Sequence, residues 1–134
     1  MIVLDASAAF EAVVVRDPLD AVAGRLAEED ELLAPYLIDI EVLNALREAV
    51  LRDELGIDRA SDARDDFADL ALSRYPHEPF IDRIWDLRNE LSAYDAAYLA
   101  LAEAISIPLI TCDRGLAAVA ARTVEVELFP PRAG

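Results

Sequence analysis

The stretch from Leu91 to Glu103, LSAYDAAYLALAE, constrains the fold more than any other part of the sequence. It has the length of a helix, and alanine, leucine and tyrosine occupy all of its faces, so it has no face suited to water. Such a helix is predicted to be central. The first turn nevertheless carries Asp95, and burying an ionised carboxylate is costly unless something compensates its charge. The fold must therefore cover this helix and also supply a partner for Asp95.

Short apolar runs alternate with helical segments along the rest of the chain, and Pro18 suits the first turn of one of them. Besides the stretch above, the predicted helices cover residues 6–15, 18–29, 36–55, 58–73, 79–91 and 113–122. The predicted strands cover residues 1–5, 32–35, 107–111 and 123–128. Strands that alternate with helices favour a parallel sheet covered on both faces. We therefore predict an α/β fold, a three-layer α/β/α sandwich around a central, mostly parallel sheet.

Apolar spacing predicts which side chains of these helices are buried. Along residues 79–91 the stripe consists of Phe80, Ile84, Leu87 and Leu91, and Trp85 fits beside it as a core residue. Along residues 36–55 the apolar spacing places Leu37, Ile40, Leu43 and Leu46 on one face, with Val42, Ala45 and Ala49 beside it. Gly56 is predicted to end this helix, and Asp58 to cap the next one.

The charge of the chain limits its partners. All 12 basic residues are arginine, and the formal net charge is -15. A broad basic surface for nucleic acid is therefore excluded, and a polyanion must be reached through bridging metal ions and a few arginines. Arg114 and Arg88 are candidates for touching phosphate, with a solvated helix position as the alternative for each.

Targeting signals are weak. The single cysteine, Cys112, has no intrachain partner, which fits a reducing compartment, and we interpret it as a small buried filler. The first residues lack a basic segment and are interrupted by Asp5, so they resemble no signal peptide. No apolar run is long enough to span a bilayer. We expect a cytoplasmic protein without a membrane partner.

Four acidic residues occur where strands lead into helices or in first helical turns. Asp5 ends the first strand, Asp113 follows the strand at 107–111, and Glu41 and Asp95 lie in first turns. Each can be explained alone, since the helix N-terminus favours acids as caps or near the dipole. In parallel sheets, however, ligands sit outside the carboxyl ends of the strands. Carboxylates gathered there would raise each other's pKa unless a cation neutralised them.

The ligand types narrow the chemistry. Oxygen ligands without histidine or cysteine select Mg²⁺ or Mn²⁺ over zinc. Receiver-type phosphoacceptors and haloacid-dehalogenase-like phosphatases also use acids at sheet ends, but both rely on a lysine, and this chain has none. The phosphatases also need an aspartate two residues after the first, where this chain has Ser7. Metal-assisted hydrolysis of phosphodiesters remains, because it needs carboxylates and little else.

The segments MIVLDASA, APYLIDIEVLNALR and LSAYDAAYLALAEAISIPLITCDRGLA, in this order, resemble the PIN-domain ribonucleases, and within them the VapC-type toxins of bacterial toxin–antitoxin pairs. The resemblance covers nearly the whole chain, so we expect a nuclease domain at 1–129 and a tail at 130–134. It implies a Mg²⁺-dependent endoribonuclease, with Mn²⁺ as the other candidate ion. The family's acidic quartet falls on the four residues Asp5, Glu41, Asp95 and Asp113.

In the family the positions of Asp5 and Asp95 hold the metal most directly, and those of Glu41 and Asp113 complete the pocket. Ser7 takes the place of a hydroxyl that the family often has near the site. The resemblance further implies an RNA substrate, a homodimer and a cognate VapB-type antitoxin that blocks the pocket.

Two further residues are supporting candidates at this site, and two other functions remain open. Asn44, one turn after Glu41, is expected to hydrogen-bond within the pocket, and Arg114 lies beside Asp113. One alternative function is a catalytically silent module that keeps the fold and binds a partner. The other is a Mg²⁺-dependent phosphoacceptor, which the missing lysine disfavours.

Overall fold

A parallel sheet of five strands forms the centre of the molecule. The computed structural model describes residues 1–15, 17 and 20–130. The strands are β1 (Ile2–Leu4), β2 (Leu32–Pro35), β3 (Leu72–Tyr75), β4 (Leu109–Thr111) and β5 (Val126–Leu128). Their order is β3-β2-β1-β4-β5, and every neighbouring pair is parallel. The predicted α/β sandwich is confirmed, with a sheet that is parallel throughout.

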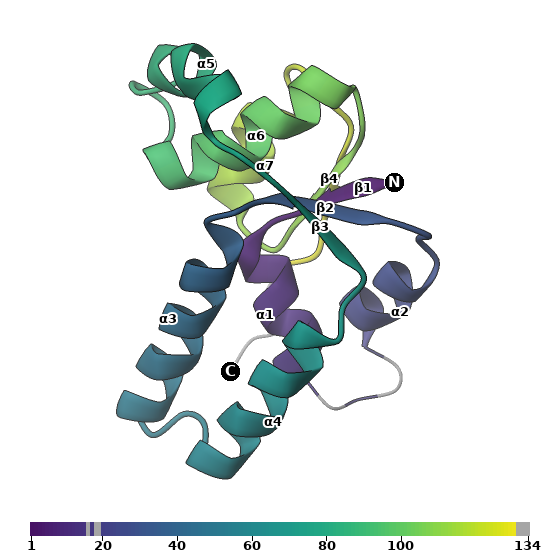
Figure 1. Ribbon diagram of the computed structural model, residues 1–134, viewed down its shortest axis with the longest axis vertical. Helices are drawn as coiled ribbons and strands as arrows, with labels where there is room; N and C mark the ends of the chain where they lie inside the picture. The colour runs from purple at the N-terminus through teal and green to yellow at the C-terminus, as the bar shows by residue number, and fades with distance from the viewer. Residues whose placement is uncertain (16, 18–19, 131–134) are drawn as a thin grey trace.

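Helices cover both faces of the sheet, as Figure 1 shows with the sheet between the two groups. One group consists of α1 (Ala6–Val14), α2 (Ala21–Ala27), α3 (Ile38–Leu51) and α4 (Ile57–Ala68). The other consists of the 3₁₀ turn η1 (Glu78–Phe80), α5 (Ile81–Asp86), α6 (Ala93–Ile105) and α7 (Arg114–Ala120). Right-handed crossovers produce this division, because the chain adds strands first on one side of β1 and then on the other.

The direction of strand addition reverses between β1 and β4. β1 leads on to β2 on one side, while β4 lies on its other side and leads on to β5. At such a reversal the loops that leave the two strands diverge to opposite faces and open a crevice at the carboxyl ends. Asp5 follows β1 and Asp113 follows β4, so the topology brings these two acids to the crevice.

The core is centred on α6 and the inner strands. Every residue of α6 from Ala96 to Ala102 is buried, and so is every residue of β1, β2 and β4. α6 packs against all three of these strands. The apolar character of the helix on every side is thereby explained, and its predicted central position is confirmed.

One strand was not predicted. Residues up to Ser73 were assigned to the helix at 58–73, but α4 ends at Ala68 and β3 begins at Leu72. β3 lies at the edge of the sheet, and all four of its residues are only half-buried. An edge strand of this composition lacks the continuous apolar run that identified the buried strands.

The buried face of α3 also differs from the prediction. Leu46 is buried, but Ile40 and Leu43 are 69% and 44% exposed. The buried positions are Ile38, Val42, Leu46 and Ala49, so the core takes the flanking Val42 and Ala49 in place of Ile40 and Leu43. Because apolar residues occur on both sides of α3, spacing alone did not identify the side that meets the core.

Several helix ends were also predicted wrongly. α3 ends at Leu51, before Gly56, and Gly56 rather than Asp58 is the N-cap residue of α4. α2 begins at Ala21, and the side chain of Asp20 accepts a hydrogen bond from its first turn. Pro18, predicted to open this helix, lies outside the described residues.

The segment at 79–91 is less regular than its stripe suggested. It contains η1, the short α5 and a series of turns, although Leu87 of the stripe is buried as predicted. Trp85 is 66% exposed, so its assignment to the core was wrong.

The predicted boundary between the nuclease domain and the tail lies at the end of the described residues. Phe129 packs against the core. Residues 131–134 lie outside the described part, so the predicted boundary between domain and tail stays a prediction. Within the residues that are described, no helix has the length and apolar character needed to cross a membrane.

Candidate metal centre at the carboxyl ends of the strands

Asp5 is a buried carboxylate held by three donors. It is 4% exposed, and its Oδ1 accepts hydrogen bonds from Ser7 Oγ at 2.7 Å and from Ala8 N at 3.0 Å. Its Oδ2 accepts one from Thr111 Oγ1 at 2.9 Å. Burial raises the pKa of Asp5 to about 6, although the three donors lower it and the charge of Asp95 adds to the rise. Asp5 is therefore an N-cap of α1, as the simpler interpretation allowed, and also a carboxylate whose ionisation is only partly compensated.

Thr111 and Ser7 join the ends of β1 and β4. Thr111 is fully buried, and besides donating to Asp5 it accepts a hydrogen bond from Asp113 N at 2.9 Å. Ser7 Oγ accepts a hydrogen bond from Cys112 N at 3.0 Å. These two hydroxyls fix the position of Asp5 relative to the start of α7.

Asp113 caps α7 and remains exposed. Its Oδ1 accepts hydrogen bonds from Gly115 N at 2.8 Å and Leu116 N at 3.1 Å. A Cβ atom at position 115 would lie 3.2 Å from the same oxygen, so glycine gives this cap the room it needs. The capping interpretation of Asp113 is thus correct, and it leaves the carboxylate at the rim of the crevice.

Asp95 is electrostatically coupled to the other acids and differs from them in its hydrogen bonds. Ser92 Oγ accepts a hydrogen bond from Asp95 N at 3.1 Å, which starts α6. Among the described residues, no donor is bonded to the Asp95 carboxylate, which is half-buried. Burial raises its pKa, and the charge of Asp113 raises it further. Since Asp95 in turn raises the pKa of Asp5 and of Glu41, it is electrostatically coupled to all three other acids.

Glu41 is held by a tyrosine that the sequence analysis counted as apolar. Tyr98 OH donates to Glu41 Oε1 at 2.7 Å, across the boundary between α6 and α3. Tyr98 is 1% exposed, and burial raises the pKa of its phenol, so it stays a proton donor. Burial also raises the pKa of the half-buried Glu41, while the hydrogen bond from Tyr98 lowers it and the charge of Asp95 raises it.

The donor set fits a hard divalent cation by its chemistry. All four side chains are carboxylates, and no arginine among the described residues forms an ion pair with any of them. As they stand, however, no three Asp, Glu, His or Cys side chains in the described part of the chain form a group that could hold a metal ion. In this arrangement Asp5, Glu41 and Asp113 each accept hydrogen bonds from donors of the protein itself.

Two cavities each include one of the four acids, Glu41 or Asp113, in their lining. One, of about 430 Å³, lies between α1 and α3 and is lined by Ala6, Ser7, Phe10, Glu11, Glu41, Asn44, Ala45, Glu48 and Cys112. The other is lined by Ser7, Cys112, Asp113, Arg114 and Gly115. Ser7 and Cys112 belong to both, so the two cavities adjoin at the end of β4.

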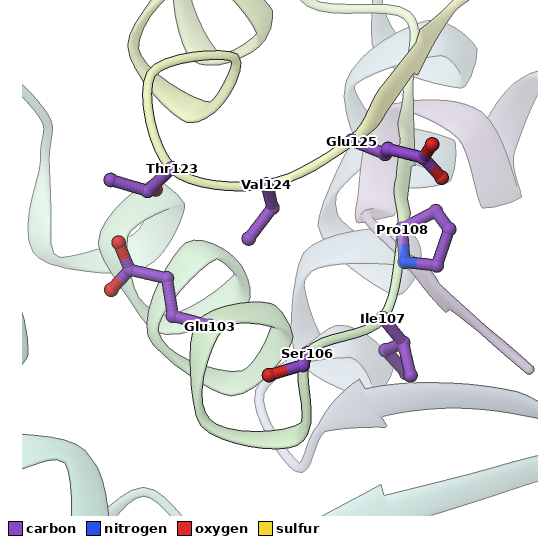
Figure 2. A pocket seen from close by; sticks show the side chains of 7 residues that line it. All are labelled: Glu103, Ser106, Ile107, Pro108, Thr123, Val124 and Glu125. Atoms are coloured by element: carbon purple, nitrogen blue, oxygen red, sulfur yellow. The ribbon is translucent and has the colours of Figure 1, made fainter.

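A third cavity, of about 430 Å³, lies at the opposite end of α6 (Figure 2). Its lining residues are Glu103, Ser106, Ile107, Pro108, Thr123, Val124 and Glu125. These residues precede β4 and β5, whereas Asp5, Glu41 and Asp113 follow β1, β2 and β4, and Asp95 lies at the other end of α6. None of the four acids lines this cavity, so it is not the candidate site.

The supporting residues lie near the site in different roles. Ser7 contacts Asp5 directly, as described above. Asn44 is exposed, lines the cavity beside Glu41 and donates to Glu48 Oε1 at a long 3.4 Å. Arg114 is exposed at the rim. Cys112 is buried, and burial raises the pKa of its thiol to about 12, in keeping with an inert filler.

Thr111 and Tyr98 were missed by the sequence analysis. Thr111 stood in the run PLIT, which was interpreted only as a strand, and Tyr98 stood in a helix that appeared uniformly apolar. A signal for Thr111 was present, because a polar residue at the carboxyl end of a buried strand points to the crevice. For Tyr98 the sequence offered no comparable signal.

Comparison with known proteins agrees with this architecture. The PIN domain family matches residues 2–122. Two ribonucleases of Mycobacterium tuberculosis, VapC1 and VapC12, are each 41% identical to this chain. The alignment covers 94% of this chain and 96% of VapC1, and 96% of this chain and 98% of VapC12.

Solved structures share the fold at lower identity. PAE2754 from Pyrobaculum aerophilum has a TM-score of 0.72 at 21% identity, over 93% of this chain and 82% of that one. VapC20 of Mycobacterium tuberculosis, described as a Sarcin-Ricin loop cleaving toxin, has a TM-score of 0.64 at 16% identity, over 89% of this chain and 95% of that one. Since the family match spans nearly all of the sequence and the curated relatives align almost from end to end, this chain belongs to the PIN-domain family, among its VapC-type ribonucleases.

Proposed function

We propose that this protein is a Mg²⁺-dependent endoribonuclease toxin that hydrolyses RNA in the cytoplasm, with Mn²⁺ as the alternative ion. The observation that carries the proposal is the uncompensated charge of Asp95. This half-buried carboxylate has a raised pKa, no bonded donor among the described residues, and three other acids within electrostatic reach. A bound divalent cation would provide the missing compensation.

In this proposal Asp5 and Asp95 hold the ion, and Glu41 and Asp113 complete its surroundings. When bound, such an ion supplies a Lewis acid and lowers the pKa of coordinated water. Ser7 and Thr111 fix the orientation of Asp5. Tyr98 fixes Glu41, a carboxylate that can take a proton from the attacking water.

The partners follow from the same surfaces. Ile40 and Leu43 leave an apolar strip of α3 exposed, which would suit the homodimer expected of the family. The cavity beside Glu41 combines apolar walls with carboxylates. It would suit a VapB-type antitoxin segment that presents an arginine or lysine to the site.

The test is RNA cleavage by the purified protein and by Asp5→Asn and Asp95→Asn variants, in Mg²⁺, in Mn²⁺ and in a chelator. We expect each substitution to lower the cleavage rate at least about 100-fold while the fold persists. Asp58→Asn, a change of an exposed acid on α4, is the matched control and should cleave at the wild-type rate.

The competing functions give different results. A catalytically silent binding module would bind the ion, measured by calorimetry, without any metal-dependent turnover. A phosphoacceptor would form a stable aspartyl phosphate from acetyl phosphate. Cleavage by Asp95→Asn at the wild-type rate would show that the assignment of the site is wrong.

A further inference from the structure

The single tryptophan of the chain is exposed at the end of α5. Trp85 is 66% exposed, although an indole gains more than any other side chain from burial. The exposed ring of Trp85 is held in place by a contact with Arg88. The guanidinium carbon of Arg88 lies 4.8 Å from the centre of the indole ring, and Arg88 Nη1 donates to the Trp85 carbonyl at 3.0 Å. The two flat groups therefore lie against each other on the surface.

Arg88 also differs from Arg83 and Arg122, because it has no acidic partner among the described residues. Arg83 pairs with Glu103, and Arg122 pairs with Glu90. Among the described residues, no carboxylate forms an ion pair with Arg88. Its positive charge therefore remains available to a ligand, in a chain whose net charge is -15.

The segment that carries Trp85 and Arg88 leads directly into α6, which carries Asp95. The turns between α5 and α6 are closed by backbone hydrogen bonds, including Leu91 N to Leu87 O at 3.0 Å, and Leu87 is buried. α5 packs against α6, as Figure 1 shows near the top of the view. Arg88 precedes Asp95 by seven positions, so their Cα atoms lie at most roughly 25 Å apart, within the span of a short RNA.

A second exposed aromatic ring lies even nearer to the acids. Tyr94 immediately precedes Asp95 in the first turn of α6 and is 64% exposed. Aromatic surface is thus available both beside the candidate metal centre and on the segment that leads into it.

We propose that Trp85 and Arg88, together with Tyr94, form a stacking surface for unpaired bases of RNA. Nucleobases stack on indole and guanidinium planes, and this contact tolerates all four bases. Asp82 and Asp86 on α5 are also exposed, so stacking rather than general attraction of phosphates provides the affinity. A base-paired RNA hides its base faces and binds this surface poorly. The inference rests on the proposed ribonuclease function and assigns a substrate-binding role beside it.

The lone tryptophan makes a direct test feasible. A short unpaired oligoribonucleotide is titrated into the protein, in a chelator and in parallel with the Asp5→Asn variant in Mg²⁺, so that the RNA stays intact. We expect quenching of the tryptophan fluorescence, which reports on position 85 alone, and much weaker quenching by the same sequence as a duplex. Quenching that is equal for both RNAs, or absent for both, overturns the proposal.

Variants test the contribution of each group, with affinity measured by the anisotropy of labelled RNA. Trp85→Ala should weaken binding roughly 5- to 100-fold, Arg88→Gln should weaken it less, and Trp85→Phe should retain most of it. Ile57→Ala removes a comparably exposed apolar side chain of α4 and should leave the affinity unchanged. Unchanged affinity of both Trp85→Ala and Arg88→Gln contradicts the proposal, whatever the cleavage rate.

Two outcomes separate this inference from its alternatives. Quenching by unpaired RNA in the chelator, together with no cleavage by the wild type in Mg²⁺ or Mn²⁺, supports the stacking surface and contradicts the nuclease. If Trp85 instead faces a second copy of the chain, its emission shifts with protein concentration in the absence of RNA, and RNA does not quench it. That result overturns the stacking surface and assigns Trp85 to a dimer interface.

Discussion

The two ends of α6 carry half-buried acids in opposite electrostatic surroundings. Near the carboxyl end of the helix, Glu103 receives two hydrogen bonds from Arg83, at 2.7 and 3.0 Å, and these lower the pKa of its carboxyl. Figure 2 shows Glu103 at the edge of the cavity at that end. In the first turn of the same helix, Asp95 has no cationic partner among the described residues, and burial raises its pKa.

This difference distinguishes an acid that is paired within the protein from acids that are available to bind a ligand. Arg83 neutralises the charge of Glu103, so the acid at that end of α6 already has a cationic partner within the protein. At the other end, Asp5, Glu41 and Asp95 all have raised pKa values, and the fold bears the cost of their ionisation. Natural proteins accept such a cost mainly at functional sites. The contrast therefore supports the proposed metal site at the first turn of α6.

The largest effect on stability is expected from pH. The pKa of Asp5 rises from 3.8 to about 6 on folding, so between these values the folded state binds the proton more tightly than the unfolded state. Stability from this group is fully present below about pH 4 and is lost as the pH rises to about 6, by about 3 kcal/mol. Unfolding in urea between pH 4 and 7, without divalent ions, measures the change.

The variant Asp5→Asn isolates this contribution from the other acids of the chain. It should remove the part of the pH dependence that Asp5 causes and stabilise the metal-free protein at pH 7. Saturating Mg²⁺ should stabilise the wild type at pH 7 and the variant less. An equal loss of stability with pH in both proteins would show that Asp5 is compensated by other means.

A smaller effect is expected when the bond between α3 and α6 is removed. Tyr98→Phe deletes the donor to Glu41 and leaves a half-buried carboxylate for water to solvate. We expect a loss of about 1 to 2 kcal/mol at pH 7, because hydrogen bonds to charged groups are stronger than neutral ones. In a Glu41→Gln background the same substitution should cost less, and the double-mutant cycle gives the coupling.

Tyr94→Phe is the matched control for this measurement, because Tyr94 is on the same helix but 64% exposed. Its effect should stay within about 0.5 kcal/mol. If both tyrosine variants had the same small effect, the Tyr98–Glu41 bond would contribute nothing measurable.

The predictable part of the fold is the part with a simple burial pattern. β1, β2 and β4 are buried on both faces and appear as short apolar runs, so the sequence was sufficient to find them. β3 is half-buried at an edge, and α3 has apolar residues on two sides, of which the core takes only one. In both cases the outcome depends on neighbours that are distant in sequence. Local patterns do not record these neighbours.

The candidate site shows the same limit. Asp5 and Asp113 were predicted from strand ends, and Asp95 from the contrast with its apolar helix. Thr111 bonds to a residue that is 106 positions away in the sequence, and Tyr98 to one that is 57 positions away. Spacing along the chain does not reveal such pairs. Trp85 was placed in the core because its helix was predicted to be longer than the short α5 that forms.

The smallest effect is expected at the compensated end of α6. Glu103→Gln removes one charge of an ion pair in which the arginine is 42% exposed, so we expect a loss of less than about 1 kcal/mol at pH 7. The pKa of Glu103 is lowered in the folded protein, so its contribution is present above the unfolded value of 4.5 and is lost as the pH falls. This dependence has the opposite sign to that of Asp5. Acidification should therefore reduce the difference in stability between Glu103→Gln and the wild type. The contribution of Asp5 changes the other way, so it should make the wild type more stable at low pH than at pH 7.

RNA cleavage by Glu103→Gln should equal that of the wild type, because Arg83 and Glu103 lie at the end of α6 away from the acids. A loss of cleavage as large as that expected for Asp95→Asn would mean that the two ends of the helix act together, and the contrast between them would no longer locate the site.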